Sequence, residues 1–144
     1  MALTKVQSEM AGAGQVLQVV NTTYATQTTI TSTSYTDTGL TASITPKLST
    51  STILIIATVQ GIDGSSSNFP LGIALRNGSQ IGSEFFGAAG YNNNYASAQF
   101  NYKDSPATTS AITYKIQFKS QTGGQVVVQN NSSQSGITLM EIAG

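Results

Sequence analysis

The strongest constraint on the fold is an alternation of apolar and polar side chains along short segments. In residues 112–118, Ile112, Tyr114, Ile116 and Phe118 alternate with polar residues. Successive side chains of a β-strand point to opposite faces, so this pattern predicts a strand with one buried face and one wet face. Helical spacing of apolar residues is hard to find after the first dozen residues. The chain is therefore predicted to be all-β.

Turn signals divide the chain into about eight to ten short strands. Asn77-Gly78 separates two of them, and this dipeptide favours two-residue hairpins because both central residues need positive φ. Extended segments are predicted at residues 16–20, 22–36, 40–45, 51–60, 71–76, 79–86, 95–102, 112–118, 125–129 and 137–142. Short strands with frequent turns are typical of antiparallel sandwiches, jelly rolls and barrels.

The composition excludes several kinds of chemistry. The 144 residues include six Lys or Arg, six Asp or Glu, and no Cys, His or Trp. The chain therefore lacks a thiolate nucleophile, an imidazole base and the usual zinc ligands. Six scattered cations do not form the basic face of a nucleic-acid binder, and the longest apolar run, residues 53–57, is too short to cross a bilayer. We expect no cofactor, no nucleic-acid partner and no membrane insertion.

Three predicted strands carry apolar side chains on both faces, at residues 16–20, 53–56 and 137–142. In a two-layer β domain the other sheet covers only one face of each sheet, so the second face needs another cover. Another copy of the chain is the simplest cover. The alternative is that the N-terminal segment folds back over these strands within one subunit. The predicted contact residues between copies are Val16, Leu17, Val19, Ile137, Leu139, Met140 and Ile142.

Several stretches together resemble a recurrent domain of bacteriophage tail fibres and related virion surface proteins. They are GQVLQVV at 14–20, SYTDTGL at 34–40, ITP at 44–46, DSPATTS at 104–110, TYK at 113–115 and ITLMEI at 137–142. The resemblance covers roughly residues 14–144. It implies an antiparallel β jelly-roll sandwich similar to the tumour necrosis factor-like head, forming a homotrimer whose inner sheets meet around a threefold axis. Periodicity alone does not choose three copies over two.

The resemblance divides the chain into an N-terminal tether, residues 1–13, and a jelly-roll domain, residues 14–144. Leu3, Val6 and Met10 recur at helical spacing, so a short amphipathic turn docking on another virion protein is one expectation. Disorder, or packing on its own trimer, is the other, because ten residues are marginal as an isolated helix. Related domains often end long shafts. With only the tether ahead of it, this domain is expected to be a short tip or spike carried by another protein, or a surface knob.

A Gly-, Asn- and Tyr-rich loop, residues 87–95, is the candidate receptor-binding surface, and residues 63–69 are a second candidate segment that would assist it. Tyr supplies a rigid amphipathic contact and Asn supplies neutral hydrogen bonds, which suits neutral sugars. The alternative is an ordinary solvated loop in a chain that is rich in Asn and Ser throughout. The candidate receptor-binding residues are Tyr91, Asn92, Asn93, Asn94 and Tyr95.

The carboxylates of the β domain do not form a recognisable catalytic pair. A glycosidase needs two of them about 5 to 9.5 Å apart, and nothing in the sequence fixes such a pair. We expect Asp37 and Asp104 to cap turns beside Gly39 and Pro106. Glu141 interrupts an apolar strand, so it is expected either to face solvent at an edge or to pair with a neighbour. The neighbours considered are Lys5 and Lys47.

These readings predict a non-enzymatic virion protein, made in the host cytoplasm and located at the virion surface. Its expected role is that of a short tail fibre or fibre tip that binds a host-surface glycan or receptor. The alternative is a capsid decoration or head-knob protein with a purely structural role. Polysaccharide cleavage by two carboxylates ranks third. A calcium site built from Asp63 and loop carbonyls is a weakly supported addition.

Overall fold

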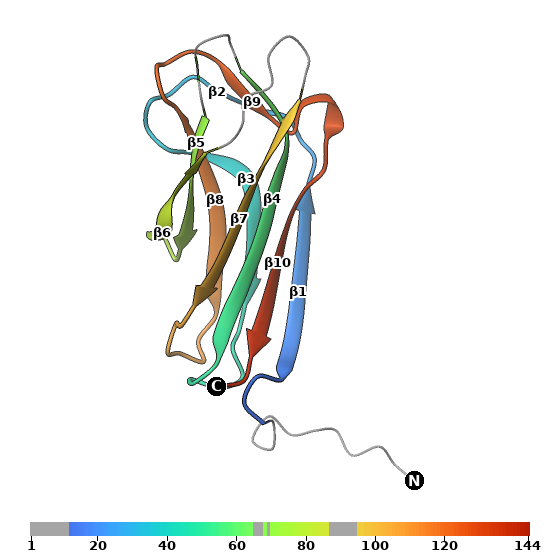
Figure 1. Ribbon diagram of the computed structural model, residues 1–144, viewed down its shortest axis with the longest axis vertical. Helices are drawn as coiled ribbons and strands as arrows, with labels where there is room; N and C mark the ends of the chain where they lie inside the picture. The colour runs from blue at the N-terminus through green and yellow to red at the C-terminus, as the bar shows by residue number, and fades with distance from the viewer. Residues whose placement is uncertain (1–11, 65–67, 69, 87–94) are drawn as a thin grey trace.

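A computed structural model of the chain describes residues 12–64, 68, 70–86 and 95–144 (Figure 1). Two antiparallel sheets pack face to face as a β-sandwich, which confirms the all-β prediction. The first sheet, here called sheet I, contains β1 (Val16–Tyr24), β10 (Ser135–Ile142), β4 (Thr52–Gly64) and β7 (Ala96–Asp104) in that order, with β9 (Val126–Val128) and β2 (Thr28–Ile30) added beyond the end of β4.

The second sheet, here called sheet II, completes the sandwich. It contains β3 (Thr36–Ile44), β8 (Ile112–Ser120), β5 (Pro70–Arg76) and β6 (Ser79–Phe86) in that order. A 3-10 turn, η2 (Asn130–Ser132), precedes β10. The strand pairs are nested: β1 pairs with β10, β2 with β9, β3 with β8, β4 with β7 and β5 with β6. The chain therefore follows the course of one long hairpin wound into two layers.

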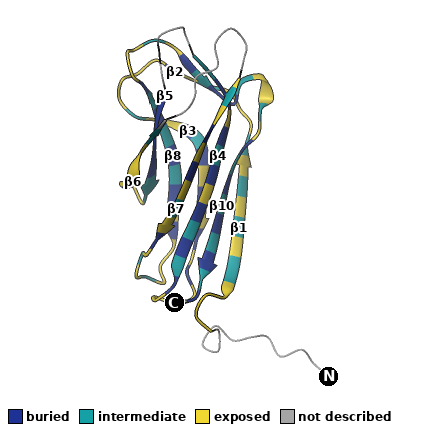
Figure 2. Ribbon diagram, in the orientation of Figure 1, coloured by how far each residue is buried: buried dark blue, intermediate teal, exposed yellow. Residues whose placement is uncertain are grey.

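Period-two alternation places the core between the sheets (Figure 2). Ile112, Tyr114, Ile116 and Phe118 on β8 are each at most 1% exposed, as the alternation predicts. The expected hairpin is also confirmed, because Asn77 and Gly78 have φ angles of 48° and 86°. Alternation and turn chemistry therefore agree over the β5 to β8 region.

The predicted extended segment at residues 22–36 is interrupted in the structure. Strand β1 ends at Tyr24, β2 covers only Thr28–Ile30, and β3 begins at Thr36. The ring of Tyr24 lies where a Cβ atom on Gly39 would sit, 2.3 Å away, and Gly39 has a φ of 85° within the irregular part of β3. A side chain at that position would displace the ring. The Thr- and Ser-rich run was predicted as one unit because its composition does not mark these breaks.

An ion pair links the two sheets at one end of the sandwich. Asp104 on β7 is 6% exposed and accepts hydrogen bonds from Arg76 Nη1 on β5 at 2.9 and 3.1 Å. The Tyr114 hydroxyl on β8 donates to the same carboxylate at 2.7 Å, and burial with this contact raises the pKa of Tyr114. The expectation that Asp104 caps a turn is wrong, because its partners lie on strands β5 and β8 of the other sheet.

We predict that Asp104→Ala lowers the free energy of unfolding by about 3 to 5 kcal/mol, because it leaves the Arg76 cation and the buried Tyr114 hydroxyl without their acceptor. Urea denaturation followed by circular dichroism measures the change. Asp37→Ala is the matched control, since its ion pair with Lys115 is exposed and is expected to contribute less than about 1 kcal/mol. Equal losses for the two variants would contradict the proposed link between the sheets.

Candidate assembly face and recognition end

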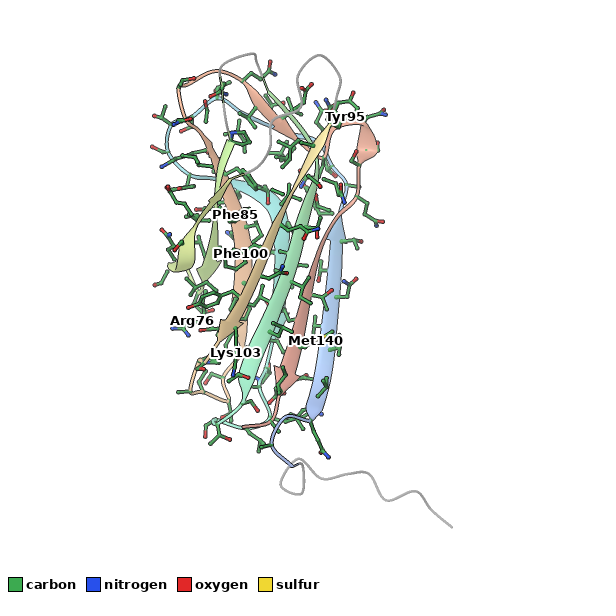
Figure 3. All side chains as sticks on the ribbon, viewed as in Figure 1. Arg76, Phe85, Tyr95, Phe100, Lys103 and Met140 are labelled. Carbon is green, nitrogen blue, oxygen red and sulfur yellow. The ribbon has the colours of Figure 1, made fainter. Side chains whose placement is uncertain are left out.

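The outer face of sheet I, the face turned away from sheet II, carries a cluster of apolar side chains. The strand register places Val19, Met140 and Leu54 in one row across β1, β10 and β4, and Lys103 on β7 continues it. Figure 3 labels Met140 and Lys103 on this sheet. The cluster, here called the apolar patch, comprises Val16, Val19, Leu54, Ile56, Met140 and Ile142.

Within the part of the chain that the structure describes, nothing else packs over the apolar patch. Val16 is 55% exposed, Val19 54% and Ile56 39%, while Leu54, Met140 and Ile142 are half-buried. These are the apolar positions for which the sequence predicted a second cover. Large exposed apolar patches mark interaction surfaces on soluble proteins.

A bulge in β1 brings Val16 and Val19 to the same face. Residues three apart on a regular strand point to opposite faces. Here Val16 pairs with Ile142 and Gln18 with Glu141, so one step on β10 matches two steps on β1. Because of this extra residue, Val16 and Val19 point to the same face of the sheet, and Val19 faces outward opposite Met140.

The structure places the predicted contact residues in three settings. Val16, Val19, Met140 and Ile142 lie on the outer face, and Leu17 is half-buried at the bulge. Ile137 and Leu139 are wrong as contact residues, because both are 0% exposed and belong to the core between the sheets.

Two residues of the apolar patch, Leu54 and Ile56, were missed as contact residues. Both lie in the run 53–56, whose apolar side chains on two faces were recognised. The pairing of Leu54 with Met140 and of Ile56 with Thr138 reveals which two of the four face outward. That information comes from the neighbouring strand.

The remaining rows of this face are polar but nearly uncharged. Asn21 Nδ2 donates to Thr138 Oγ1 at 2.8 Å, and the same row continues through Ile56 to Asn101. Among the paired residues of β1, β10, β4 and β7, Lys103 is the single charged side chain that faces outward, and Asp63 lies farther along β4, opposite Val127. A surface with this composition has little charge to desolvate when a partner covers it.

The outer face of sheet II has the opposite character. Lys115 Nζ lies 2.8 Å from Asp37, and Lys119 Nζ lies 3.0 Å from Glu84. Tyr35 also donates a hydrogen bond to Glu84, and the Lys119 ammonium lies 4.5 Å from the centre of the Tyr35 ring. This face is therefore held by ion pairs in contact with water.

Individual residues confirm this difference between the faces. Leu71 and Ile73 face outward on β5, opposite Lys119 and Gln117, yet they are only 8% and 4% exposed.

The expectation that Asp37 caps a turn is wrong, since Asp37 lies on β3. Burial raises the pKa of Asp37, but hydrogen bonds from Lys115 and Gln117 outweigh this effect and hold the pKa below its usual value.

The candidate recognition loop lies only partly within the described residues. Tyr91, Asn92, Asn93 and Asn94 fall outside them. Tyr95 is 43% exposed and directly precedes β7 (Figure 3), at the end of the sandwich opposite the start of β1 and the C-terminus (Figure 1). We call the end with Tyr95 the upper end and the end with Val16 the lower end.

The second candidate segment, residues 63–69, contributes a structural residue. Asn68 is 2% exposed, its Oδ1 accepts from the Ser120 hydroxyl at 2.9 Å, and its Nδ2 donates to the Gly124 carbonyl at 2.8 Å. The side chain of Asn68 is therefore used in hydrogen bonds within the protein.

Asp63 lines a shallow hollow of about 120 Å³. The other lining residues are Gly64, Gln125 and Val127, so Asp63 is its one carboxylate among the described residues.

Glu141 is buried at the lower end, which makes its expected exposure to solvent wrong. It is 0% exposed, and one carboxylate oxygen accepts from the backbone amides of Lys47 at 2.7 Å and Leu48 at 3.2 Å. The other oxygen accepts from Gln18 Nε2 at 2.6 Å. The expected partner Lys47 is thus contacted through its backbone, while its ammonium donates to the Leu17 carbonyl at 2.8 Å. Lys5 lies outside the described residues.

Comparison with known protein families and with curated proteins finds no match for this sequence. Within the described residues, no helix is long and apolar enough to span a membrane. No three of the described Asp and Glu side chains gather into a possible metal site. The function is therefore inferred from the two unlike outer faces and the two unlike ends of the sandwich.

Proposed function

We propose that this chain is a virion surface protein of a bacteriophage, a homotrimeric short tail fibre or fibre tip that binds a host-surface glycan or receptor without chemistry. The observation that carries the proposal is the exposed apolar patch on sheet I, in contrast to sheet II, whose outer face carries ion pairs and whose outward-facing Leu71 and Ile73 are nearly buried. The outer face of sheet I is therefore the one expected to be buried in an assembly, and the outer face of sheet II is expected to remain in water.

The strand pairing supports a jelly roll. In such a fold a long antiparallel hairpin is wound into two sheets of a sandwich. The five nested pairs, from β1 with β10 inward to β5 with β6, have this order. Sheet I collects the first and last strands and sheet II collects the hairpin at the middle of the chain. The resemblance of the sequence motifs to tail-fibre domains implies the same architecture.

The apolar patch supports copies of the same chain as its occupant. The chain carries equal numbers of acidic and basic residues, so little net repulsion opposes self-association. A patch that lies on one sheet and continues to the edge strand β1 suits contact between identical sheets packed around an axis along the strands. The number three comes from the resemblance, which implies a threefold assembly of inner sheets.

The two ends of the sandwich support a division between attachment and recognition. Gly14 N donates to the Ala143 carbonyl and Ala143 N to the Gln15 carbonyl, both at 2.8 Å, so the chain enters the domain at the lower end. Tyr95 and the strand ends that flank the candidate loop lie at the upper end (Figure 1). With a symmetry axis along the strands, the strand ends that flank the candidate loop would lie at the same end in every copy, opposite the point where the chain enters the domain.

The rival role is a capsid decoration or head-knob protein that serves only assembly. Asn68 favours it, because this residue of the second candidate loop is committed to internal hydrogen bonds. The apolar patch fits both roles equally. Ligand binding at the upper end separates the two.

We predict that Val19→Asp converts the assembly to monomers, because burying an unpaired carboxylate between apolar side chains costs several kcal/mol. Light scattering after size exclusion should give three times 15.0 kDa for the wild type and 15.0 kDa for the variant. Ser43→Asp is the matched control, on the exposed edge strand of sheet II, and should remain a trimer. A monomeric wild type would contradict the proposal.

We predict that the wild-type trimer binds neutral bacterial surface oligosaccharides on a glycan array, and that a Tyr91→Ala, Asn93→Ala, Tyr95→Ala variant does not. Loss of the aromatic platform and the amide removes stacking and hydrogen bonding together. The Ser43→Asp variant should bind like the wild type. Binding that survives the triple substitution would contradict the assigned loop, no binding by the wild type would favour the decoration role, and released sugar would favour an enzyme.

A further inference from the structure

A buried carboxylate joins three segments of the chain at the lower end, directly beneath the apolar patch. We call Glu141, Gln18 and the backbone amides of Lys47 and Leu48 the clasp. Glu141 lies on β10, Gln18 on β1, and the two amides in the connection between β3 and β4. Charge-assisted hydrogen bonds to an ionised carboxylate are among the strongest in proteins.

The clasp holds the bulged part of β1 at several points. Gln18 Nε2 donates both to Glu141 at 2.6 Å and to the Thr45 carbonyl at 2.7 Å, which uses both hydrogens of its amide group. Lys47 Nζ donates to the carbonyl of Leu17 at 2.8 Å. The extra residue of β1 is therefore tied to the loop that ends β3.

The bulge decides the composition of the apolar patch. Val16 and Val19 face the same side because one residue between them is extra. Without the bulge, Val16 would point to the opposite face of β1 and would no longer lie beside Ile142 on the outer face. The patch therefore depends on contacts made on the inner side of the strands, around Glu141.

We propose that Glu141 is a positioning residue for assembly: its ionised carboxylate holds the bulge that presents Val16 and Val19 to a second copy, and its protonation weakens the contact between copies. This inference rests on the proposed function, because it concerns the same assembly face.

The sign of the pH dependence follows from the surroundings of the carboxylate. Burial raises the pKa of Glu141, but the nearby Ser51 hydroxyl and the donors of Gln18, Lys47 and Leu48 outweigh it and hold the pKa below its ordinary value. The stabilisation is therefore fully present above the ordinary pKa of glutamate and is lost as the pH falls through the lowered pKa. Two charged groups of the described residues lie near the clasp: the Lys47 ammonium, which donates to Leu17, and Asp104, which follows Glu141 and Ile53 in one inward-facing row and is paired with Arg76.

Glu141→Gln tests the carboxylate with little change in shape. The Gln carbonyl can still accept from the Lys47 and Leu48 amides, but its NH₂ group would face the NH₂ group of Gln18. Gln18 cannot rotate its amide without losing its bond to Thr45. We expect the variant to fold and to assemble more weakly.

Sedimentation velocity of the full chain, from pH 7 to about pH 3.5 and with circular dichroism as the check on folding, measures the effect. The wild type should dissociate progressively as the pH falls. Glu141→Gln should raise the dissociation constant at pH 7 by at least about tenfold and show no further change with pH. Asp37→Asn is the matched control, because it removes a carboxylate of lowered pKa on sheet II, and it should keep the wild-type profile.

Two outcomes overturn the role of Glu141 but leave the proposed trimer standing. One is a wild-type trimer whose dissociation does not depend on pH while it is folded, and the other is a Glu141→Gln variant with the wild-type profile. A wild type that is monomeric at pH 7 overturns both proposals. If Glu141→Gln does not fold, Gln18→Ala takes its place, since it keeps the carboxylate and removes one donor. Its dissociation midpoint should move to higher pH, and an unchanged midpoint overturns the role of the clasp.

Discussion

A sheet in a two-layer sandwich has two faces, and the opposite sheet covers only one of them. The chain resolves this constraint differently on its two sheets. On sheet II, Leu71 and Ile73 are almost fully buried on a face that also carries the Lys115–Asp37 and Lys119–Glu84 ion pairs. On sheet I, comparable side chains at the lower end stay exposed. The difference between the faces is the basis of the proposed assembly and of its direction.

The exposed face depends on interactions on the buried side of the same strands. Glu141 lies between the outward-facing Met140 and Ile142, and its carboxylate joins β10 to β1 and to the loop after β3. Burial of a carboxylate is unfavourable unless several donors compensate it, and here three donors do so. A polar group inside the sandwich thus determines which apolar groups lie outside it.

Patterns of neighbouring residues predict much of the fold, whereas they do not predict which side chains meet across different strands. The alternation in β8 and the Asn77-Gly78 hairpin follow from neighbouring residues, so the sequence alone indicated both. Ile137 and Leu139 were assigned to the contact face because a strand with apolar residues on both sides does not reveal which side faces the core. Asp104 finds its donors 10 and 28 residues away on other strands, and Glu141 finds its donors up to 123 residues away, so local spacing carries no signal for either.

The most direct test of the central claim is the distance between equivalent faces in the assembly. The chain has no cysteine, so a single Thr58→Cys on the outer face of sheet I, or Ser43→Cys on that of sheet II, places one spin label in each subunit. Pulsed electron resonance should then give a short distance between labels at residue 58 and a longer one at residue 43. No dipolar coupling at either position, or a shorter distance at residue 43, would contradict burial of sheet I between copies.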